Sequence, residues 1–434
     1  MTDAAAAAPF IFIITGEPSG DALGGALIAA LRQRVGPGLR VAGIGGEQMQ
    51  AQGVTTLVPL SELAIAGVAE VLPRAPLILR RVRETVAEIQ RQRPDAVVTI
   101  DSSGFSWRIA HRLRRCGETL PLIHYVAPMV WAWRAGRARR MARWYDHLMT
   151  LLPFEPPYFE RVGLPCCYVG HPVLESGADR GDGSRFRTTH GLAQDDLLIT
   201  ALPGSRIAEV TRLLPIFGAA LNRLESLIGR FRVVVPTVGT VASTVVRAVH
   251  GWPGNPIVVH RVEDKYDAFA ASSAALAASG SVALELALAQ LPMVVGYRLN
   301  PLTEKILDRI LHVRQVNLVN LLLGRPLVCE LLGPNCTPER LATAIAELTR
   351  DEQVRAWHRQ GYDEVRRCLE VGGAAPSMRA ADQILEIVAA RRCGGPALTA
   401  VRRNLDDDDR CGRNFKADSR YRQVPPSAHD DTGP

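Results

Sequence analysis

Five short motifs place glycine, serine, acidic or basic side chains directly after apolar runs that predict buried β-strands. They occupy residues 16–21 (GEPSGD), 101–105 (DSSGF), 124–134 (HYVAPMVWAWR), 202–206 (LPGSR) and 278–285 (ASGSVALE). Glycines in such turns let a ligand approach the backbone, and the start of a following helix attracts anions. The motifs therefore suggest a site for a phosphorylated ligand with acid–base chemistry beside it.

The motif at 202–206 carries groups that suit phosphate oxygens. Gly204 and Ser205 form a turn after a predicted strand, and Arg206 offers forked N–H donors. The alternative interpretation is a surface arginine that merely follows a turn.

The motif at 278–285 combines a small-residue loop with a carboxylate. Ser279, Gly280 and Ser281 lead into a helix start, which can cradle an anion. Glu285 follows about one and a half turns later, where it can accept hydrogen bonds from ribose hydroxyls. Alternatively, the acid only complements the helix dipole.

Asp101 immediately follows the buried strand predicted for residues 96–100. A general base is suitably placed at such a sheet edge. An N-cap for a helix that begins at Ser106, or a turn aspartate, explains the same residue equally well.

The first motif supplies Gly16, Ser19, Gly20 and Asp21 as candidate ligand contacts. Its order is not the GxGxxG fingerprint of dinucleotide-binding proteins, which argues against a dinucleotide oxidoreductase. A tight strand-to-helix turn with Ser19 or Asp21 as the N-cap is the structural alternative.

Two further residues are candidates for ligand contact. Trp131 lies in a loop with a second tryptophan and a proline, and an indole beside a cleft suits a sugar face or an acyl chain. Anchoring of the loop in the core is the alternative. His171 either faces the cleft or caps the linker that follows it.

Strand-like and helix-like patterns alternate along the chain, which predicts an α/β fold with parallel sheets covered on both faces. Residues 170–191, rich in Gly, Asp, Ser and Arg, interrupt the alternation and predict a linker. We expect two doubly wound, Rossmann-like domains, residues 8–175 and 190–350, that face each other across a cleft. Residues 393–434 contain an acidic run without apolar periodicity, which predicts a disordered tail.

Composition excludes several classes of protein. The 434 residues carry 51 basic and 44 acidic side chains, and this modest excess comes without the modules that read nucleic acid. The eight cysteines form no CxxC pair or zinc-type spacing, and no apolar run is long enough for a clean membrane span. The chain starts without a basic signal region, so we expect it in the cytoplasm. Arginines cluster in the first half, either as a solvated face or for contact with anionic lipid or phosphorylated substrate.

Taken together, the motifs resemble those of the lipid-A-disaccharide synthases, inverting glycosyltransferases of the two-Rossmann-domain (GT-B) type. The resemblance runs from about residue 10 to about residue 387. It rests on four of the five motifs, all except the one at 101–105, and on six further segments: residues 43–49 (GIGGEQM), 62–72 (ELAIAGVAEVL), 151–155 (LLPFE), 169–172 (VGHP), 292–298 (PMVVGYR) and 320–328 (NLLLGRPLV).

The resemblance implies a reaction between two acylated sugars. A UDP-2,3-diacylglucosamine donor transfers its sugar to the 6-hydroxyl of 2,3-diacylglucosamine 1-phosphate, without metal or cofactor. Asp101 is then the base, and Arg206, Glu285 and Asn320 belong to the active site. The N-terminal domain binds the acceptor and the C-terminal domain the UDP-sugar.

The resemblance also implies where the protein works and with what. Such enzymes lie on the cytoplasmic face of the inner membrane. Two helices within residues 351–392 pack on the N-terminal domain or exchange between the partners of a homodimer.

Two departures from the family pattern affect single residues. The segment after Asp101 contains no second acid, which strengthens the case for Asp101. Because Asn317 also occurs nearby, the assignment of Asn320 depends on its junction with the LLLG segment. A UDP-sugar 2-epimerase on the same fold and a non-catalytic UDP-lipid or membrane-binding module are the rival functions.

Overall fold

The computed structural model describes residues 8–63, 68–131, 136–298, 315–370 and 372–393. The chain forms two compact units. The first takes in the described residues up to Glu175 together with those from Leu369 onward, and the second takes in Ser176–Cys368. The predicted tail at 393–434 lies, apart from Cys393, outside the described residues.

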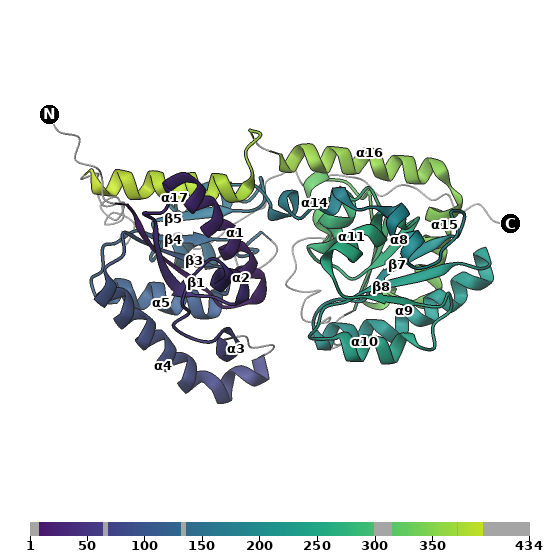
Figure 1. Ribbon diagram of the computed structural model, residues 1–434, viewed down its shortest axis with the longest axis horizontal. Coiled ribbons are helices and arrows are strands. Elements are labelled where there is room, and N and C mark those ends of the chain that lie inside the picture. The colour runs from purple at the N-terminus through teal and green to yellow at the C-terminus, as the bar shows by residue number, and fades with distance from the viewer. Residues whose placement is uncertain (1–7, 64–67, 132–135, 299–314, 371, 394–434) are drawn as a thin grey trace. The chain divides into compact units, whose positions relative to one another are not determined.

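The first unit is built on a parallel sheet of six strands in the order β2-β1-β3-β4-β5-β6 (Figure 1). The strands are β1 (Phe10–Thr15), β2 (Arg40–Ile44), β3 (Ala96–Ile100), β4 (Leu122–Tyr125), β5 (His147–Thr150) and β6 (Cys166–Tyr168). The helices are α1 (Pro18–Val35), α2 (Glu47–Ala51), α3 (Leu60–Leu63), α4 (Val68–Gln92), α5 (Ser103–Arg115), α6 (Gly136–Ala142), α7 (Pro156–Glu160) and α17 (Pro376–Arg392), with a 3-10 turn η1 at Pro172–Glu175.

Both faces of this sheet are buried, which explains its continuous apolar strands. Alternate side chains of β1 serve two different cores. Phe12 and Ile14 pack with α4 and α5, whereas Ile11 and Ile13 pack with α1 and α17. The predicted α/β class is confirmed.

The second unit repeats the plan with the order β12-β11-β10-β7-β8-β9, again all parallel. The strands are β7 (Leu198–Leu202), β8 (Arg232–Pro236), β9 (Ile257–Val259), β10 (Ala274–Ala277), β11 (Met293–Tyr297) and β12 (Cys329–Leu332). The helices are α8 (Gly183–Thr189), α9 (Ile207–Ile228), α10 (Ala242–Val249), α11 (Val262–Ala271), α12 (Val282–Leu288), α14 (Leu318–Leu323), α15 (Pro338–Arg350) and α16 (Glu352–Leu369), with 3-10 turns η2 (Ala178–Arg180) and η3 (Gly333–Asn335).

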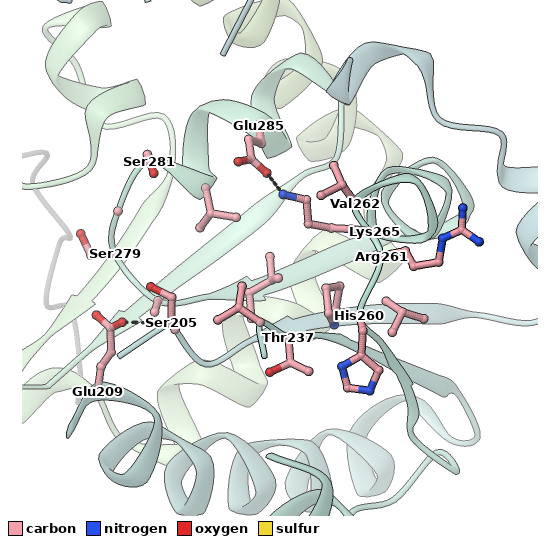
Figure 2. Close-up of a pocket in the computed structure, with 18 residues that line it drawn as sticks. Ser205, Glu209, Thr237, His260, Arg261, Val262, Lys265, Ser279, Ser281 and Glu285 are labelled. Carbon is pink, nitrogen blue, oxygen red and sulfur yellow. Dashed lines mark hydrogen bonds and ion pairs between the residues drawn. The ribbon is translucent and has the colours of Figure 1, made fainter. Parts of the chain in front are cut away.

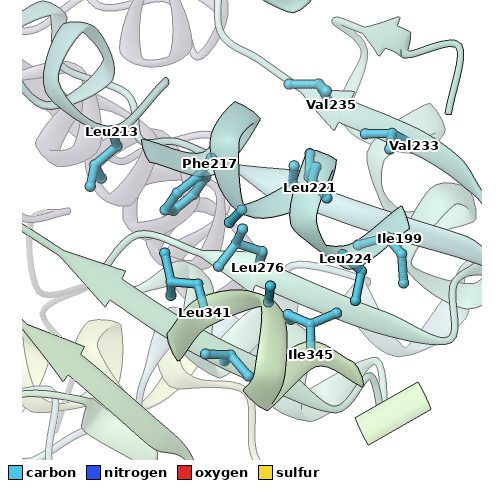
Figure 3. Packing of buried hydrophobic residues seen from close by; sticks show 14 of the residues in the cluster. Ile199, Leu213, Phe217, Leu221, Leu224, Val233, Val235, Leu276, Leu341 and Ile345 are labelled. Atoms are coloured by element: carbon cyan, nitrogen blue, oxygen red, sulfur yellow. The ribbon is translucent and has the colours of Figure 1, made fainter. Parts of the chain in front are cut away.

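The larger core of the second unit lies between its sheet and the pair α9 and α15 (Figure 3). Phe217 and Leu221 of α9 meet Leu341 and Ile345 of α15 over Leu276 of β10. On the other face, α8 and α11 cover the sheet. This packing holds the loops at the carboxyl ends of the strands in place.

Each sheet has one point at which the strand order reverses, and loops leaving such a point diverge and leave room for a ligand. In the first unit this point lies between β1 and β3, and in the second between β7 and β10. Motifs 16–21 and 101–105 follow the first pair of strands, and motifs 202–206 and 278–285 follow the second. Topology therefore brings these four motifs together in pairs.

The sequence analysis expected two C-terminal helices that pack on the N-terminal domain or exchange between the partners of a homodimer. In this structure α17 belongs to the first unit and almost all of α16 to the second. In α17, Ala380 and Ile384 pack into the core that α1 also lines. Glu364 of α16 forms an ion pair at 2.9 Å with Arg325, which lies just after α14 in the second unit. Among the helices of the described residues, none combines the length and hydrophobicity needed to cross a bilayer.

Candidate active site

A pocket of about 260 Å³ lies at the switch point of the second unit (Figure 2). Its walls are the loops that follow β7, β8, β9 and β10, together with the first turns of the helices behind them. The polar side chains that line it are Ser205, Glu209, Thr237, His260, Arg261, Lys265, Ser279, Ser281 and Glu285. The pocket thus collects most of the predicted phosphate- and ribose-binding residues.

Glu285 points toward the pocket from α12 and is paired with a lysine from α11. Lys265 Nζ lies 2.6 Å from Glu285 Oε2, and about a fifth of each side chain is exposed. Sequence analysis missed Lys265 because it stands in an acidic stretch, EDKYD, that is typical of a solvated helix surface. No local pattern marks it, since its partner lies on another helix.

The turn after β7 depends on a glycine. Gly204 has φ +117°, and a β-carbon there would stand 2.6 Å from Glu209 Cδ. The Glu209 carboxylate accepts the Ser205 backbone N–H at 3.2 Å, which fixes the turn against the first turn of α9. Arg206 is the N-cap residue of α9, its side chain is exposed, and it is not among the pocket-lining residues.

The loop after β10 lines the opposite side of the pocket. Ser279, Gly280 and Ser281 all contribute to the lining. A β-carbon on Gly280 would meet nothing within 4 Å, which shows that there is open space beside the loop. Backbone groups and two hydroxyls are therefore accessible to a ligand here.

Asn320 lies away from the pocket, and its amide is fully engaged by the protein. Its Oδ1 accepts the N–H groups of Leu327 and Val328, at 2.9 and 2.8 Å. Its Nδ2 donates to the Val328 carbonyl at 2.8 Å and to Glu330 Oε1 at 2.6 Å. The side chain is buried, so the structure places Asn320 as a support for the segment that joins α14 to β12.

In the first unit, Asp101 and Ser102 end β3 with an unusual backbone. Both have positive φ, at 50° and 47°, which is uncommon for residues with a side chain and tends to occur at functional sites. Asp101 does not cap α5, because Ser102 is the N-cap residue. The Asp101 carbonyl accepts the Ser106 hydroxyl at 3.0 Å, and the carboxylate is partly exposed.

The motif at 16–21 divides into ligand-accessible and structural residues. Asp21 is buried, and its carboxylate accepts backbone N–H groups of Gly46, Gln48 and Met49 at 2.7, 2.9 and 3.1 Å. It therefore holds the start of α2 in place, and both of its oxygens are engaged in this contact. Ser19 is exposed in the first turn of α1, and Gly20 is buried.

His171 takes the structural one of its two predicted roles. Its Nδ1 accepts the Val173 backbone N–H at 3.1 Å, which caps the turn η1. Burial lowers the pKa of His171 to about 4, so the ring is neutral at physiological pH.

Trp131 and its surroundings contain a carboxyl group that sequence analysis missed. The Trp131 ring packs edge-on against Phe154, with centroids 5.5 Å apart. The neighbouring Glu155 is buried, and burial raises its pKa to about 7 even though it accepts N–H groups from Leu151 and Leu152. A buried acid beside a loop proline gives no local sequence pattern that would distinguish it from a helix cap.

Across the described residues, no three histidine, cysteine, aspartate or glutamate side chains cluster as metal ligands would. The side chains and backbone at the two switch points supply carboxylates, hydroxyls, backbone amides and nearby cations. This set can bind a nucleotide and move one proton.

Solved structures with the same architecture define the class of protein. The Neisseria meningitidis UDP-GlcNAc 2-epimerase bound to UDP-GlcNAc aligns with a TM-score of 0.59 at 10% identity, covering 88% of this chain and 99% of that one. The Acinetobacter baumannii MurG aligns with a TM-score of 0.53 at 14% identity, covering 87% and 99%. The fold is thus that of the GT-B class, with two Rossmann-like units.

Sequence relatives narrow this class to one family. The family model for lipid-A-disaccharide synthetase matches residues 11–386. The lipid-A-disaccharide synthase of Rhodospirillum centenum is 55% identical over 381 residues, which are 88% of this chain and 95% of the relative. That of Paramagnetospirillum magneticum is 50% identical over 380 residues, or 87% and 97%. The chain belongs to the lipid-A-disaccharide synthase family, and the resemblance drawn from its motifs is confirmed.

Proposed function

We propose that this protein is a glycosyltransferase of lipid A biosynthesis. It condenses UDP-2,3-diacylglucosamine with 2,3-diacylglucosamine 1-phosphate and releases UDP and the β-1,6-linked disaccharide 1-phosphate. Membership of the family over residues 11–386 carries this proposal. The polar pocket at the switch point of the second unit supports it, because a nucleotide is the ligand expected there.

The UDP moiety of the donor occupies the pocket of the second unit. Ser279, Gly280 and Ser281 present hydroxyl and amide donors to the pyrophosphate, and Glu285 accepts hydrogen bonds from the ribose. Arg206, exposed at the start of α9, adds its guanidinium to the departing diphosphate as charge develops there. No metal is needed if these donors carry the charge.

Asp101 of the first unit is the general base. It removes the proton of the acceptor 6-hydroxyl as that oxygen attacks the anomeric carbon, and the bond to UDP breaks on the opposite face. A single displacement of this kind inverts the configuration and gives the β linkage. The partly exposed carboxylate on a strained strand end supports this role. In this proposal Asn320 supports the second unit rather than the reaction, because its amide is hydrogen-bonded to the segment that leads into β12.

Both substrates are acylated, so the enzyme meets them at the cytoplasmic surface of the inner membrane. The exposed arginines of α5, which are Arg108, Arg112 and Arg115, support contact with anionic headgroups or with the acceptor phosphate. A homodimer is compatible with this assignment, and α17 is the helix available for exchange between partners.

A turnover assay in detergent micelles tests the proposal. Purified protein is given both acylated substrates, and disaccharide 1-phosphate is quantified for wild type, Asp101→Asn and Arg206→Ala. We expect product from wild type, a loss of at least about 100-fold in Asp101→Asn, and a smaller loss in Arg206→Ala. Full activity in Asp101→Asn would contradict the role of Asp101 as the base but not the proposed reaction.

A second arm separates the proposed function from the epimerase. Wild type that binds UDP but makes no disaccharide, and instead epimerises water-soluble UDP-N-acetylglucosamine, overturns the proposed function. UDP binding without any turnover, unaffected by Asp101→Asn, identifies a binding module instead.

A further inference from the structure

Lys265 occupies a wall of the pocket that no motif marks. Its Nζ lies 2.6 Å from Glu285 Oε2 (Figure 2). It also lies 4.6 Å from the centroid of the Tyr266 ring, which is itself buried. The ammonium is therefore held between a fixed aromatic face and the carboxylate. Only three of the 51 basic residues are lysines, and Lys265 alone among these three lies in the described part of the chain.

The ion pair restrains Glu285 on one side only. Lys265 comes from α11 and Glu285 from α12, so the contact ties together two helices that begin at the pocket. With Oε2 engaged, the carboxylate is held in one orientation, and Oε1 is the oxygen left for a ligand. A carboxylate that is held in place accepts a hydrogen bond at a lower entropic cost than one that rotates freely.

The charge of Lys265 matters as well as its position. A diphosphate ligand carries negative charge, and an uncompensated carboxylate in the same pocket would repel it. The ammonium balances Glu285 and leaves the pocket able to accept both a diphosphate and a hydroxyl donor.

We propose that Lys265 is a positioning residue that sets the ribose specificity of the pocket. It holds the Glu285 carboxylate where Oε1 accepts a ribose hydroxyl, so that a ribonucleotide is preferred over a deoxyribonucleotide. This inference rests on the proposed function, in which Glu285 contacts the ribose of the donor.

Nucleotide binding to the full-length protein tests the inference. Isothermal titration calorimetry measures the dissociation constants of UDP, 2′-deoxy-UDP and 3′-deoxy-UDP for wild type, Lys265→Met and Lys265→Arg. We expect wild type to prefer UDP over at least one deoxy analogue by about tenfold. In Lys265→Met this preference falls to about twofold or less, while Lys265→Arg, which keeps the cation, retains most of it.

A matched control removes a different ion pair from the same helix. Arg185 pairs with Asp267 of α11 at 2.7 Å, and neither residue lines the pocket. Arg185→Met should leave the preference for UDP at the wild-type value. Lys265→Gln, which keeps an N–H donor for Glu285 without the charge, serves as a second variant should Lys265→Met unfold.

The outcomes distinguish the inference from the function on which it rests. Wild type that fails to bind UDP contradicts the proposed function of the pocket. Wild type that binds all three nucleotides equally, or a Lys265→Met variant that loses affinity for all three in the same proportion, overturns the positioning role and leaves the donor site intact.

Discussion

The backbone of Gly16 lies against the side chain of Ser102, so that a β-carbon at position 16 would stand 2.7 Å from Ser102 Cβ and overlap its hydroxyl. This contact joins the loops that follow β1 and β3 at the switch point of the first unit. Because Ser102 adjoins Asp101, any group larger than hydrogen at position 16 must displace the proposed base or its neighbour.

The first prediction follows from this contact. Gly16→Ala should lower kcat at least about tenfold and destabilise the fold by about 1–3 kcal/mol, because overpacking forces the β3 loop to shift. Steady-state kinetics and urea unfolding measure the two effects. Gly104→Ala, in the first turn of α5 just after this loop, is the control, since the nearest side-chain atom to a β-carbon there would be Arg108 Nη1 at 3.7 Å. Equal behaviour of the two variants would contradict the role of the close approach.

The second prediction is that Asp21 contributes to stability rather than to ligand binding. Asp21→Ala leaves three backbone N–H groups at the start of α2, one buried and two partly buried, without their acceptor, so we expect a loss of about 2–3 kcal/mol of unfolding free energy. Urea denaturation measures it. Ser19→Ala, at an exposed position, should stay within about 0.5 kcal/mol of wild type. An Asp21→Ala protein with wild-type stability and lost UDP or acceptor binding would restore a ligand-binding role.

The third prediction concerns Asn320. Asn320→Ala removes the acceptor of two buried N–H groups and a donor to Glu330, so we expect destabilisation by about 2–4 kcal/mol, with activity lost in proportion to the unfolded fraction. Thermal unfolding measures the loss of stability, and kcat at a temperature where the variant is folded measures the loss of activity. Asn335→Ala, at an exposed site, is the control. A stable Asn320→Ala variant with lost kcat would mean direct contact with substrate.

Much of this fold can be predicted from the sequence because both faces of each long strand are buried. The runs that form β1 and β3 are continuous and apolar, so their type and limits follow from composition. The short strands β5, β6 and β12, of 4, 3 and 4 residues, are harder to predict because so few residues show no period. Helix α1 begins at Pro18, earlier than the apolar spacing indicates, since proline is accepted in a first turn.

The position of the candidate site can be predicted from the sequence better than the role of each side chain in it. Motifs at the ends of β7 and β10 could be assigned to one place because sheet topology determines where strand ends meet. What a polar side chain binds depends on its tertiary partners. Asp21 accepts backbone N–H groups from another loop, Asn320 accepts those of the segment that follows α14, and Lys265 of α11 pairs with Glu285 of α12. Residue type alone does not distinguish these roles from ligand contact.

The fourth prediction uses His171. Burial lowers its folded-state pKa to about 4, below the ordinary value of 6.5. The unfolded chain therefore takes up a proton first as pH falls, and the stabilisation present above about pH 6.5 is lost towards pH 4, amounting to at most about 3 kcal/mol. His171→Asn keeps an acceptor for Val173 N–H without this titration. Urea unfolding at several pH values should give a flatter profile for the variant, and an unchanged profile would contradict the assignment.

The fifth prediction concerns Glu155, for which stability should change with pH in the opposite direction. Burial raises its folded-state pKa to about 7, from an ordinary value of 4.5. The folded protein therefore holds a proton that the unfolded chain has already released, and stability is lost as pH rises from about 4.5 through 7, by at most about 3 kcal/mol. Glu155→Gln keeps an oxygen that accepts the N–H groups of Leu151 and Leu152 and cannot ionise. At pH 8 the variant should be more stable than wild type, and at pH 4.5 the two should agree. A variant that is less stable than wild type at pH 8 would show that the ionised carboxylate is favoured in the folded state.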